Sequence, residues 1–362
     1  MKPIRVRLRD HAYTIHLTSS YAQLPRLLDR LETGRHGWVI SHRSLLDRYG
    51  THVTGPLRRA GWTIRTITVP ESELTKSNAM AERVMRRLAQ DSAMRVPVLF
   101  AFGGGVVGDL TGFVAAVFRR GVPYVQLPTT LLAQVDSAIG GKVGVDLPMA
   151  KNFVGAFYQP RLVMNNLSVL QSLPVRQRRS GLSEIIKYAA IADPQLFHFL
   201  ETHLAACLQG ELRVDRVMVE RCARIKARVV SRDERDVSGV RAQLNFGHTL
   251  GHALEAATGY TRLTHGEAIA IGMAYAAQLS AEMGVCRQQE ADRLRALLTA
   301  AGLPTRATRV SLGAVERALK LDKKFSRGRM RWIVFKRIGR VSASEAVSPV
   351  LMRRVLRRFV VP

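Results

Sequence analysis

The pattern of apolar segments changes near residue 175, and this change most constrains the fold. Before it, short apolar runs at residues 38–41, 96–102 and 124–127 are each followed by a turn and a helical pattern. Buried strands that alternate with helices are typical of a parallel α/β sheet. After it, long amphipathic segments predict helices at residues 181–191, 214–230, 247–257 and 266–283. We therefore predict an α/β domain with a Rossmann-like parallel sheet at residues 1–175 and an all-helical domain at residues 176–362.

The composition indicates an ordinary globular protein. The chain has 362 residues, 47% of them hydrophobic, with a mean hydropathy of -0.01, which argues against a disordered chain. The first ten residues lack the apolar core of a signal peptide, and no apolar run approaches the thickness of a bilayer. Cys207, Cys222 and Cys286 are too far apart for a zinc finger or a disulfide framework. We expect reduced thiols, a cytoplasmic location and no membrane partner.

The net charge of +27 raises the question of nucleic-acid binding. The basic residues are spread over the whole chain, with modest clusters at residues 176–179, 320–331 and 352–358. No zinc-finger spacing and no aromatic RNA-binding signature accompanies them. We therefore interpret the charge as a solvated surface that attracts anionic substrates, and specific nucleic-acid binding is not expected.

A glycine-rich loop follows the apolar run at residues 96–102. Gly103, Gly105 and Gly108 match Gly-x-Gly-x-x-Gly between a predicted strand and a predicted helix. Glycines let the backbone approach a pyrophosphate, and the helix N-terminus supplies amide donors. The acidic ribose ligand expected about 20 residues later is missing. The loop is therefore either a non-standard nucleotide site or a tight structural turn.

Polar residues interrupt the apolar sequence at residues 128–142 and 151–160. They include Thr129, Thr130, Asp136, Lys142, Lys151 and Asn152, set among glycines. A structural loop has no need of this mixture. A phosphorylated polyhydroxy substrate does, because each hydroxyl and phosphate oxygen needs a donor or an acceptor.

Three histidines lie close together in the second half. His248 and His252 are four residues apart, so they share one face of a helix, and His265 follows shortly after. This spacing can present two imidazoles to one metal ion. The alternative is a set of capping or core histidines in a helix interrupted by glycines.

Taken together, these motifs identify a resemblance. From the first strand to about residue 335 the chain resembles the 3-dehydroquinate synthase family, through ordered motifs at residues 103–113, 120–121, 128–142, 151–160, 183–188, 244–252, 265–267 and 322–324. The resemblance implies a homodimeric enzyme with NAD and one divalent metal ion, zinc or cobalt. It implies conversion of 3-deoxy-D-arabino-heptulosonate 7-phosphate to 3-dehydroquinate and phosphate, through oxidation by NAD, phosphate elimination, reduction and an intramolecular aldol closure.

The resemblance also implies roles for individual residues. The metal ligands would be Glu184, His248 and His265, with His252 facing the substrate. Catalytic residues would be Asp136, Lys142, Lys187, Asn245 and His252; substrate-binding residues would be Arg120 (contributed by the partner subunit), Asn152, Lys226, Arg241 and Lys324, with Lys323 as the alternative to Lys324. The NAD-binding residues would be Glu73, Lys76, Gly103, Gly104, Gly105, Asp109, Thr129, Thr130, Asp136 and Lys151.

Some positions depart from the family pattern. Ser41 and His42 stand where an acidic or amide residue is usual near the adenosine ribose, and Ser72 and Ala150 replace glycines. Gln177 replaces an acidic residue. Two simpler interpretations also stay open: Glu184 and Lys187 could form a surface ion pair, and Lys226 could be a solvated helix lysine.

Three other functions compete with this prediction. Other sugar-phosphate cyclases, such as 2-deoxy-scyllo-inosose or 2-epi-5-epi-valiolone synthase, resemble the same family but alter the segments that here keep the dehydroquinate-synthase form, at residues 136–142 and 241–245. A metal-dependent dehydrogenase of the glycerol-dehydrogenase type would accumulate NADH. A basic nucleic-acid-binding protein that has lost catalysis would not need the set Glu184, His248 and His265.

Overall fold

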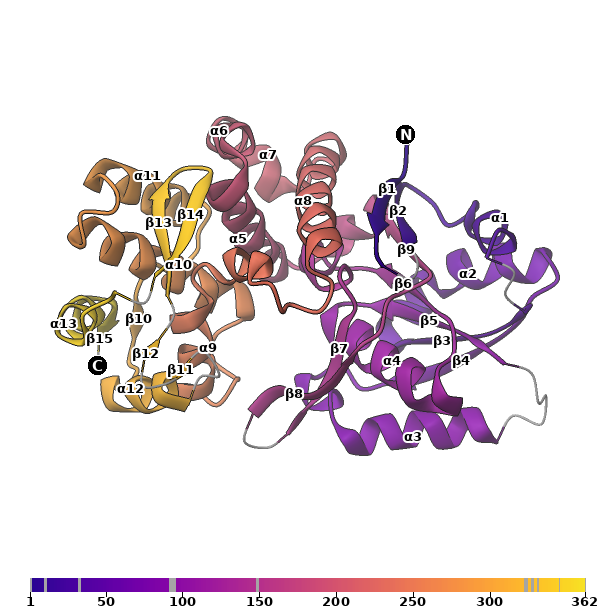
Figure 1. The fold of residues 1–362 in the computed structure, drawn as a ribbon. Coiled ribbons are helices and arrows are strands. Elements are labelled where there is room, and N and C mark those ends of the chain that lie inside the picture. Colours follow the sequence, from indigo (N-terminus) through magenta and orange to yellow (C-terminus); the bar gives the residue numbers. More distant parts are fainter. Residues whose placement is uncertain are drawn as a thin grey trace. The chain divides into compact units, whose positions relative to one another are not determined.

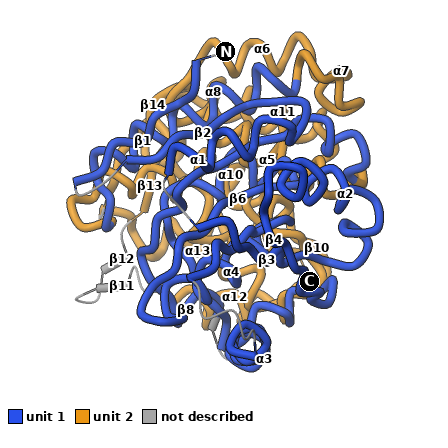
Figure 2. Tube along the Cα trace, turned by 90° about the vertical axis from the view of Figure 1, so that its right-hand side faces the viewer, with its two compact units in different colours: residues 1–173, 215–235 blue, residues 174–214, 236–362 orange. Residues whose placement is uncertain are grey.

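A computed structural model describes most of the chain. It covers residues 2–9, 12–31, 34–90, 96–147, 150–321, 325–326, 329–330, 332–344 and 346–361. The chain divides into two compact units: Met1–Leu173 with Asp215–Arg235, and Pro174–Val214 with Asp236–Pro362 (Figure 2). The division at residue 175 expected from the sequence differs from this one in residues 215–235. Within the described residues, no helix is both long and apolar enough to cross a membrane.

The first unit contains a seven-stranded sheet in the order β1-β2-β9-β6-β5-β3-β4. Its strands pair in parallel except β1 and β2, which are antiparallel. The strands are β1 (Ile4–Arg7), β2 (Ala12–Thr18), β3 (His36–His42), β4 (Thr63–Val69), β5 (Val98–Gly103), β6 (Tyr124–Pro128) and β9 (Leu162–Asn166). The three strands predicted from apolar runs are β3, β5 and β6, so the predicted parallel sheet is confirmed.

Helices cover both faces of this sheet, because successive residues of a buried strand point to opposite sides. Val39 and Phe100 pack with α1 (Leu24–Asp29) and α2 (Arg43–Arg59). Ile40 and Leu99 pack with α3 (Asn78–Ala89) and α4 (Gly105–Val117), on the other side of the sheet in Figure 1.

Helix α8 (Leu212–Arg232) belongs to this unit although it follows three helices of the second unit. Its residues Ala223, Ala227 and Val230 pack with Ile15 of β2 and Val163 of β9. The helix therefore completes the cover over the β1-β2-β9 end of the sheet. A sequence pattern does not reveal this, because it reports an apolar face but not the surface against which that face packs.

A β-hairpin adds to the first unit beside α4. It consists of β7 (Lys142–Leu147) and β8 (Ala150–Phe157), paired antiparallel. Val143, Val145 and Val154 pack into the same core as α4. The opposite side of β8 leaves Phe153 and Phe157 exposed. The hairpin thus carries the predicted polar residues Lys142, Lys151 and Asn152 on a scaffold that is anchored in the core through its valines.

The second unit is built mainly of helices, although the sequence predicted an all-helical domain. They are α5 (Val175–Ala192), α6 (Pro194–Thr202), α7 (Leu204–Gln209), α9 (His248–Ala257), α10 (His265–Glu282), α11 (Gln288–Ala300), α12 (Leu312–Leu321) and α13 (Pro349–Phe359). The unit also contains strands, chiefly the hairpin β13 (Trp332–Arg337) and β14 (Arg340–Ser344). Trp332, Val334 and Phe335 are buried aromatic and β-branched residues, which favour strand over helix.

Helix α10 lies at the centre of the second unit and packs against α5, α9, α11, α13 and β13. Two glycines allow its backbone to come very close to its neighbours. A Cβ atom on Gly266 would lie 2.2 Å from the carbonyl oxygen of Ser180 in α5. A Cβ atom on Gly272 would lie 1.9 Å from the carbonyl oxygen of Gly247, which precedes α9. These contacts hold α5, α9 and α10 together close to the candidate metal ligands Glu184, His248 and His265.

Substitution of Gly272 by Ala is expected to lower the free energy of unfolding by about 1–3 kcal/mol, because the added methyl group meets backbone and forces α9 and α10 apart. Urea unfolding followed by circular dichroism measures this. Gly313→Ala in α12 is the control, since a Cβ there has only ordinary contacts with side-chain atoms of Arg317 and Ser311. Equal stability of the two variants would contradict the proposed close crossing.

Candidate active site

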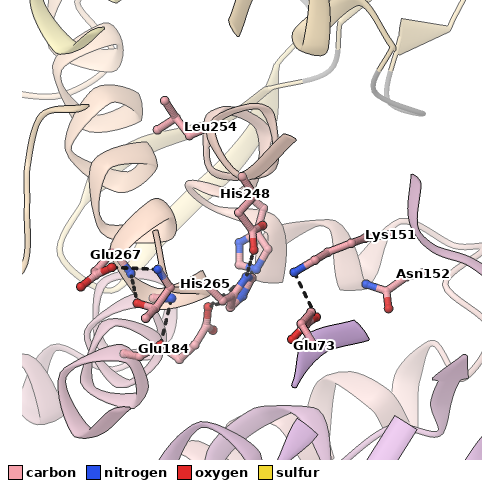
Figure 3. A network of polar contacts seen from close by, with 12 residues as sticks. Glu73, Lys151, Asn152, Glu184, His248, Leu254, His265 and Glu267 are labelled. Atoms are coloured by element: carbon pink, nitrogen blue, oxygen red, sulfur yellow. Dashed lines mark hydrogen bonds and ion pairs between the residues drawn. The ribbon is translucent and has the colours of Figure 1, made fainter. Parts of the chain in front are cut away.

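Glu184, His248 and His265 form a cluster of possible metal ligands in the second unit. One ligand atom from each lies within 4.8 Å of the others. The Nε2 atoms of His248 and His265 lie 3.7 Å and 3.6 Å from Oε1 of Glu184. In Figure 3 the three side chains point toward one another. The set predicted from the family resemblance is therefore brought together from three helices, of which α5 lies far from α9 and α10 in sequence.

The local structure of each helix explains this placement. Glu184 lies on α5 where the helix is buried on all sides, and it has no exposed surface. His248 is the first residue of α9 and follows Gly247, whose φ of +79° suits glycine. His265 is the first residue of α10, which begins with a capping box between Thr264 and Glu267.

An ion pair supports the start of α10. The Arg176 guanidinium donates to both carboxylate oxygens of Glu267, at 2.9 Å and 2.8 Å. Burial raises the pKa of Glu267, but the hydrogen bonds from Arg176 and the Thr264 backbone lower it by more. Glu267 is therefore ionised in the capping box and keeps the first turn of α10, with His265, in place.

The charges around Glu184 suit a cation. Burial lowers the pKa of His265, but the carboxylates of Glu184 and Glu255 raise it by more, to about 10. An imidazole with such a pKa is protonated at neutral pH, so the cluster already attracts one positive charge. Two imidazole nitrogens and a carboxylate oxygen are also the donors that Zn²⁺ or Co²⁺ takes in proteins. The residues present therefore fit one divalent metal ion.

Lys187 lies beside this cluster and pairs with Oε2 of Glu184. Its side chain is 1% exposed, and its ammonium lies 5.0 Å from the ring centroid of Tyr188. The interpretation as a surface ion pair is therefore wrong, because both partners are buried. Lys187 holds one carboxylate oxygen while the other faces the two imidazoles.

His252 and Glu255 extend the cluster along α9. His252 is exposed, and its ring meets that of His248 edge to face at 5.3 Å between centroids. With His265 they form a second set of possible ligands. Glu255 was not predicted from the sequence, although its position seven residues after His248 places it on the same helical face.

Two further residues predicted for the second unit, Arg241 and Asn245, lie shortly before His248 in sequence. Arg241 is buried and Asn245 half-buried, and both lie on η5 (Val240–Asn245), which packs against α5. Lys323 and Lys324 lie outside the described residues.

The glycine loop of the first unit connects β5 to α4, as predicted. Gly104 is the N-cap of α4 and supplies no side-chain cap, and the first turn of the helix contains no acidic residue. A Cβ atom on Gly104 or Gly105 would lie 3.0 Å from Thr130 or 3.2 Å from Ser137. Thr129 donates its backbone N–H to Gly103 at 2.9 Å. The glycines have no side chains in the way, and the N-cap residue offers no side-chain cap to the first amides of α4. This helix end is therefore fit for a pyrophosphate.

A network around the buried Lys76 side chain joins the predicted NAD-binding residues Lys76 and Asp109. The Lys76 ammonium donates to Asp109 Oδ2 at 2.6 Å and also to Oδ1 of Asn152. Burial lowers the pKa of Lys76, and the carboxylates of Asp109, Asp146 and Glu73 raise it by more. Lys76 therefore stays charged and fixes both partners. Lys151 pairs with Glu73 at 3.0 Å, shown by the dashed line in Figure 3.

Asp146 is a central member of this network that the sequence analysis missed. Its Oδ1 accepts the backbone N–H of Asn152 at 2.7 Å and lies 4.0 Å from the Lys76 ammonium. Its own N–H donates to the Lys76 carbonyl at 2.8 Å. Asn152 has a φ of +54°, which is unusual for a residue other than glycine. Asp146 therefore helps hold a strained backbone whose side chain faces Lys76.

Two further predicted residues form a pair in the first unit. The Lys226 ammonium on α8 donates to the side chain of Asp136 at 2.7 Å and to its carbonyl oxygen at 2.8 Å. Lys226 is 7% exposed, so its interpretation as a solvated helix lysine is wrong. Lys142 is exposed, as is Arg120 on η2 (Phe118–Arg120).

Residues of the first unit that depart from the family pattern have structural roles. The Ser41 hydroxyl is fully buried and donates to the Phe102 carbonyl at 2.6 Å. His42 Nδ1 lies 3.2 Å from the Val69 carbonyl, which only accepts, so this nitrogen donates. Ser72 caps η1 (Glu73–Thr75) by accepting the Leu74 N–H at 3.2 Å. Ser41 therefore joins β3 to β5, and Ser72 orders the segment that carries Glu73 and Lys76.

Solved structures with the same fold include two cyclases and a dehydrogenase. A 2-epi-5-epi-valiolone synthase from Streptomyces hygroscopicus, with NAD⁺ and Zn²⁺ bound, has a TM-score of 0.88 at 24% identity, over 97% of this chain and 98% of that one. A 2-deoxy-scyllo-inosose synthase with carbaglucose-6-phosphate, NAD⁺ and Co²⁺ has a TM-score of 0.86 at 23% identity, over 99% and 100%. A glycerol dehydrogenase from Schizosaccharomyces pombe has a TM-score of 0.66 at 16% identity, over 95% and 88%.

Sequence comparisons are more specific than the fold. Residues 66–180 match the family model of the 3-dehydroquinate synthase N-terminal domain, and residues 181–325 match that of the C-terminal domain. A 3-dehydroquinate synthase from Rhodopseudomonas palustris is 42% identical, over 98% of this chain and 96% of the relative. One from Pelotomaculum thermopropionicum is 43% identical, over 94% and 92%. The chain belongs to the 3-dehydroquinate synthase family.

Proposed function

We propose that this chain is a 3-dehydroquinate synthase. It converts 3-deoxy-D-arabino-heptulosonate 7-phosphate to 3-dehydroquinate and phosphate, with NAD and one Zn²⁺ or Co²⁺ ion. The observation that carries the proposal is the cluster of Glu184, His248 and His265, in a chain whose relatives of this name are 42–43% identical. The other cyclases share the fold at 23–24% identity, which supports the fold alone.

The protein residues have separable roles in this reaction. Glu184, His248 and His265 hold the metal ion, and three protein ligands leave coordination positions for substrate oxygens. The amides at the start of α4, with Lys76 and Asp109, hold NAD; Glu73, Thr129, Thr130 and Lys151 complete its site. Bound NAD would supply reversible hydride acceptance at the substrate's C5 carbinol, and a bound metal ion would supply Lewis acidity toward the oxygens at that carbon and its neighbour.

The remaining residues bind and orient the substrate, which carries a carboxylate and a phosphate. Cationic side chains match these anions: Lys142, Lys187, Lys226, Arg241 and Lys324, together with Arg120 from a second copy of the chain. Asp136, Asn152, Asn245 and His252 provide donors and acceptors for hydroxyl groups. The Asp136–Lys226 pair fixes both side chains before the substrate arrives, so little ordering is needed on binding.

The reaction itself tests the proposal. Metal-loaded protein with NAD is expected to release phosphate from 3-deoxy-D-arabino-heptulosonate 7-phosphate, and EDTA is expected to stop it, because chelation removes the ion held by Glu184, His248 and His265. Absorbance at 340 nm should show no accumulating NADH, since the hydride is returned. Accumulating NADH would favour the glycerol-dehydrogenase type. No phosphate release, with metal and NAD both bound, would leave sedoheptulose 7-phosphate and glucose 6-phosphate as substrates to try.

Substitution of Asp146 by Ala is expected to raise KM for the substrate about tenfold or more, because Asn152 loses the hydrogen bond that holds its left-handed backbone. Steady-state kinetics measures KM and kcat separately. Asp47→Asn is the control, since Asp47 pairs with Arg43 on an exposed helix surface. If Asp146→Ala behaves like this control, Asp146 has no positioning role.

The expected homodimer also has a direct test. If Arg120 acts in the site of a second copy, Arg120→Ala and Glu184→Gln are each inactive alone but complement each other when mixed. Random exchange in a symmetric dimer restores about a quarter of the sites, because half the dimers are mixed and each has one intact site. Phosphate release after refolding the mixture measures this. No recovery, with exchange verified by mass, would place Arg120 within its own subunit's site or outside any site.

A further inference from the structure

Glu255 lies next to the proposed metal site and is not one of its three proposed ligands. Its carboxylate is 4% exposed, and its Oε1 lies 3.5 Å from Nδ1 of His265. The Nε2 atom of the same ring lies 3.6 Å from Oε1 of Glu184. The imidazole of His265 therefore lies between two buried carboxylates, one at each ring nitrogen.

His248 provides a comparison within the same cluster. Its Nδ1 lies 3.2 Å from the Phe246 carbonyl, and its Nε2 faces Glu184 Oε1 at 3.7 Å. A carbonyl oxygen only accepts hydrogen bonds, so Nδ1 of His248 carries a proton, and Nε2 is the nitrogen that can offer a lone pair to a metal ion. Both histidines thus present Nε2 to Glu184 while a protein oxygen faces Nδ1. In His248 that oxygen is neutral, and in His265 it belongs to a carboxylate.

We propose that Glu255 is a positioning residue that fixes the tautomer and ring orientation of His265 so that Nε2 binds the metal ion beside Glu184. The inference rests on the proposed function, because it assumes that the set Glu184, His248 and His265 holds the ion. A carboxylate that accepts a hydrogen bond from the far nitrogen of a metal-binding imidazole also makes the imidazole a more basic, stronger metal ligand.

A competing arrangement makes Glu255 a metal ligand. His252, Glu255 and His265 also have ligand atoms within 4.8 Å of one another. The two nitrogens of His265 point in opposite directions, so one ion cannot bind both sets through this ring. Burial separates the two possibilities: Glu184 and His248 are both buried, whereas His252 is exposed. The set at Glu184 therefore has two buried members besides His265, against one for the other set, and this favours the ion there, with Glu255 as the partner of Nδ1.

Metal affinity tests the proposal without relying on turnover. Zn²⁺ is titrated into the metal-free full-length protein against a chromogenic chelator, for wild type, Glu255→Ala and Glu255→Gln. Glu255→Ala is expected to weaken Zn²⁺ binding about 10–100-fold. Glu255→Gln should lose less, because its amide oxygen still accepts from Nδ1. The Co²⁺-loaded protein should show a changed visible spectrum in Glu255→Ala, with one ion per chain in every variant.

Controls separate this role from a structural one. Glu282→Gln on α10 removes a carboxylate that pairs with Arg354 and Arg358, and it should bind Zn²⁺ like wild type. Unfolding midpoints of the metal-free variants show whether Glu255→Ala is folded. If it is unfolded, the test rests on Glu255→Gln. A Zn²⁺ affinity and a Co²⁺ spectrum of Glu255→Gln that both equal those of wild type then overturn the proposal.

Three other outcomes are informative. Unchanged Zn²⁺ affinity in both Glu255 variants overturns the proposal. A second ion in wild type that both Glu255→Ala and His252→Ala abolish also overturns it, since Glu255 is then a ligand. A wild-type protein that binds no Zn²⁺ contradicts the proposed function instead.

Discussion

The buried carboxylate of Glu184 is the group on which the candidate site depends. A carboxylate with no exposed surface costs several kcal/mol of desolvation unless positive charge lies beside it. Lys187 supplies one positive charge at Oε2, and His265 supplies another near Oε1 when it is protonated. A divalent ion held by the two imidazoles would take the place of that proton. The helix crossing at Gly266 and Gly272 brings these groups together, so packing and electrostatics depend on each other.

The first unit holds its charged groups by the same physical means. Lys76 is buried among Asp109, Asp146 and Glu73, and Lys226 is held by Asp136. These pairs leave little freedom to side chains that are proposed to meet NAD and the substrate. Exposed pairs such as Arg86 with Glu82 contribute little to stability by comparison, because water screens them. The net charge of +27 therefore says less about the site than the few buried cations do.

Much of the fold follows from local sequence patterns. The apolar runs that become β3, β5 and β6 are short and bounded by turns, and the glycine loop follows β5 as predicted. The hairpin of β13 and β14 was missed within a helical region, although Trp332, Val334 and Phe335 are typical of strands. The place of α8 in the first unit was also missed. Amphipathic periodicity identifies a helix but does not name the surface that its apolar face covers.

The sequence by itself determined the chemical inventory of the site, because metal-binding and anion-binding residues must be present as particular side chains at ordered motifs. It did not determine which groups meet. The i, i+4 spacing of His248 and His252 suggested a pair of ligands, the family resemblance implied Glu184, His248 and His265 instead, and the structure brings that second set together from three helices. Asp146 and Glu255 have roles only because of what lies opposite them, the Asn152 amide and the His265 ring. Contacts between side chains on different strands and helices arise from packing, and only the tertiary structure decided them.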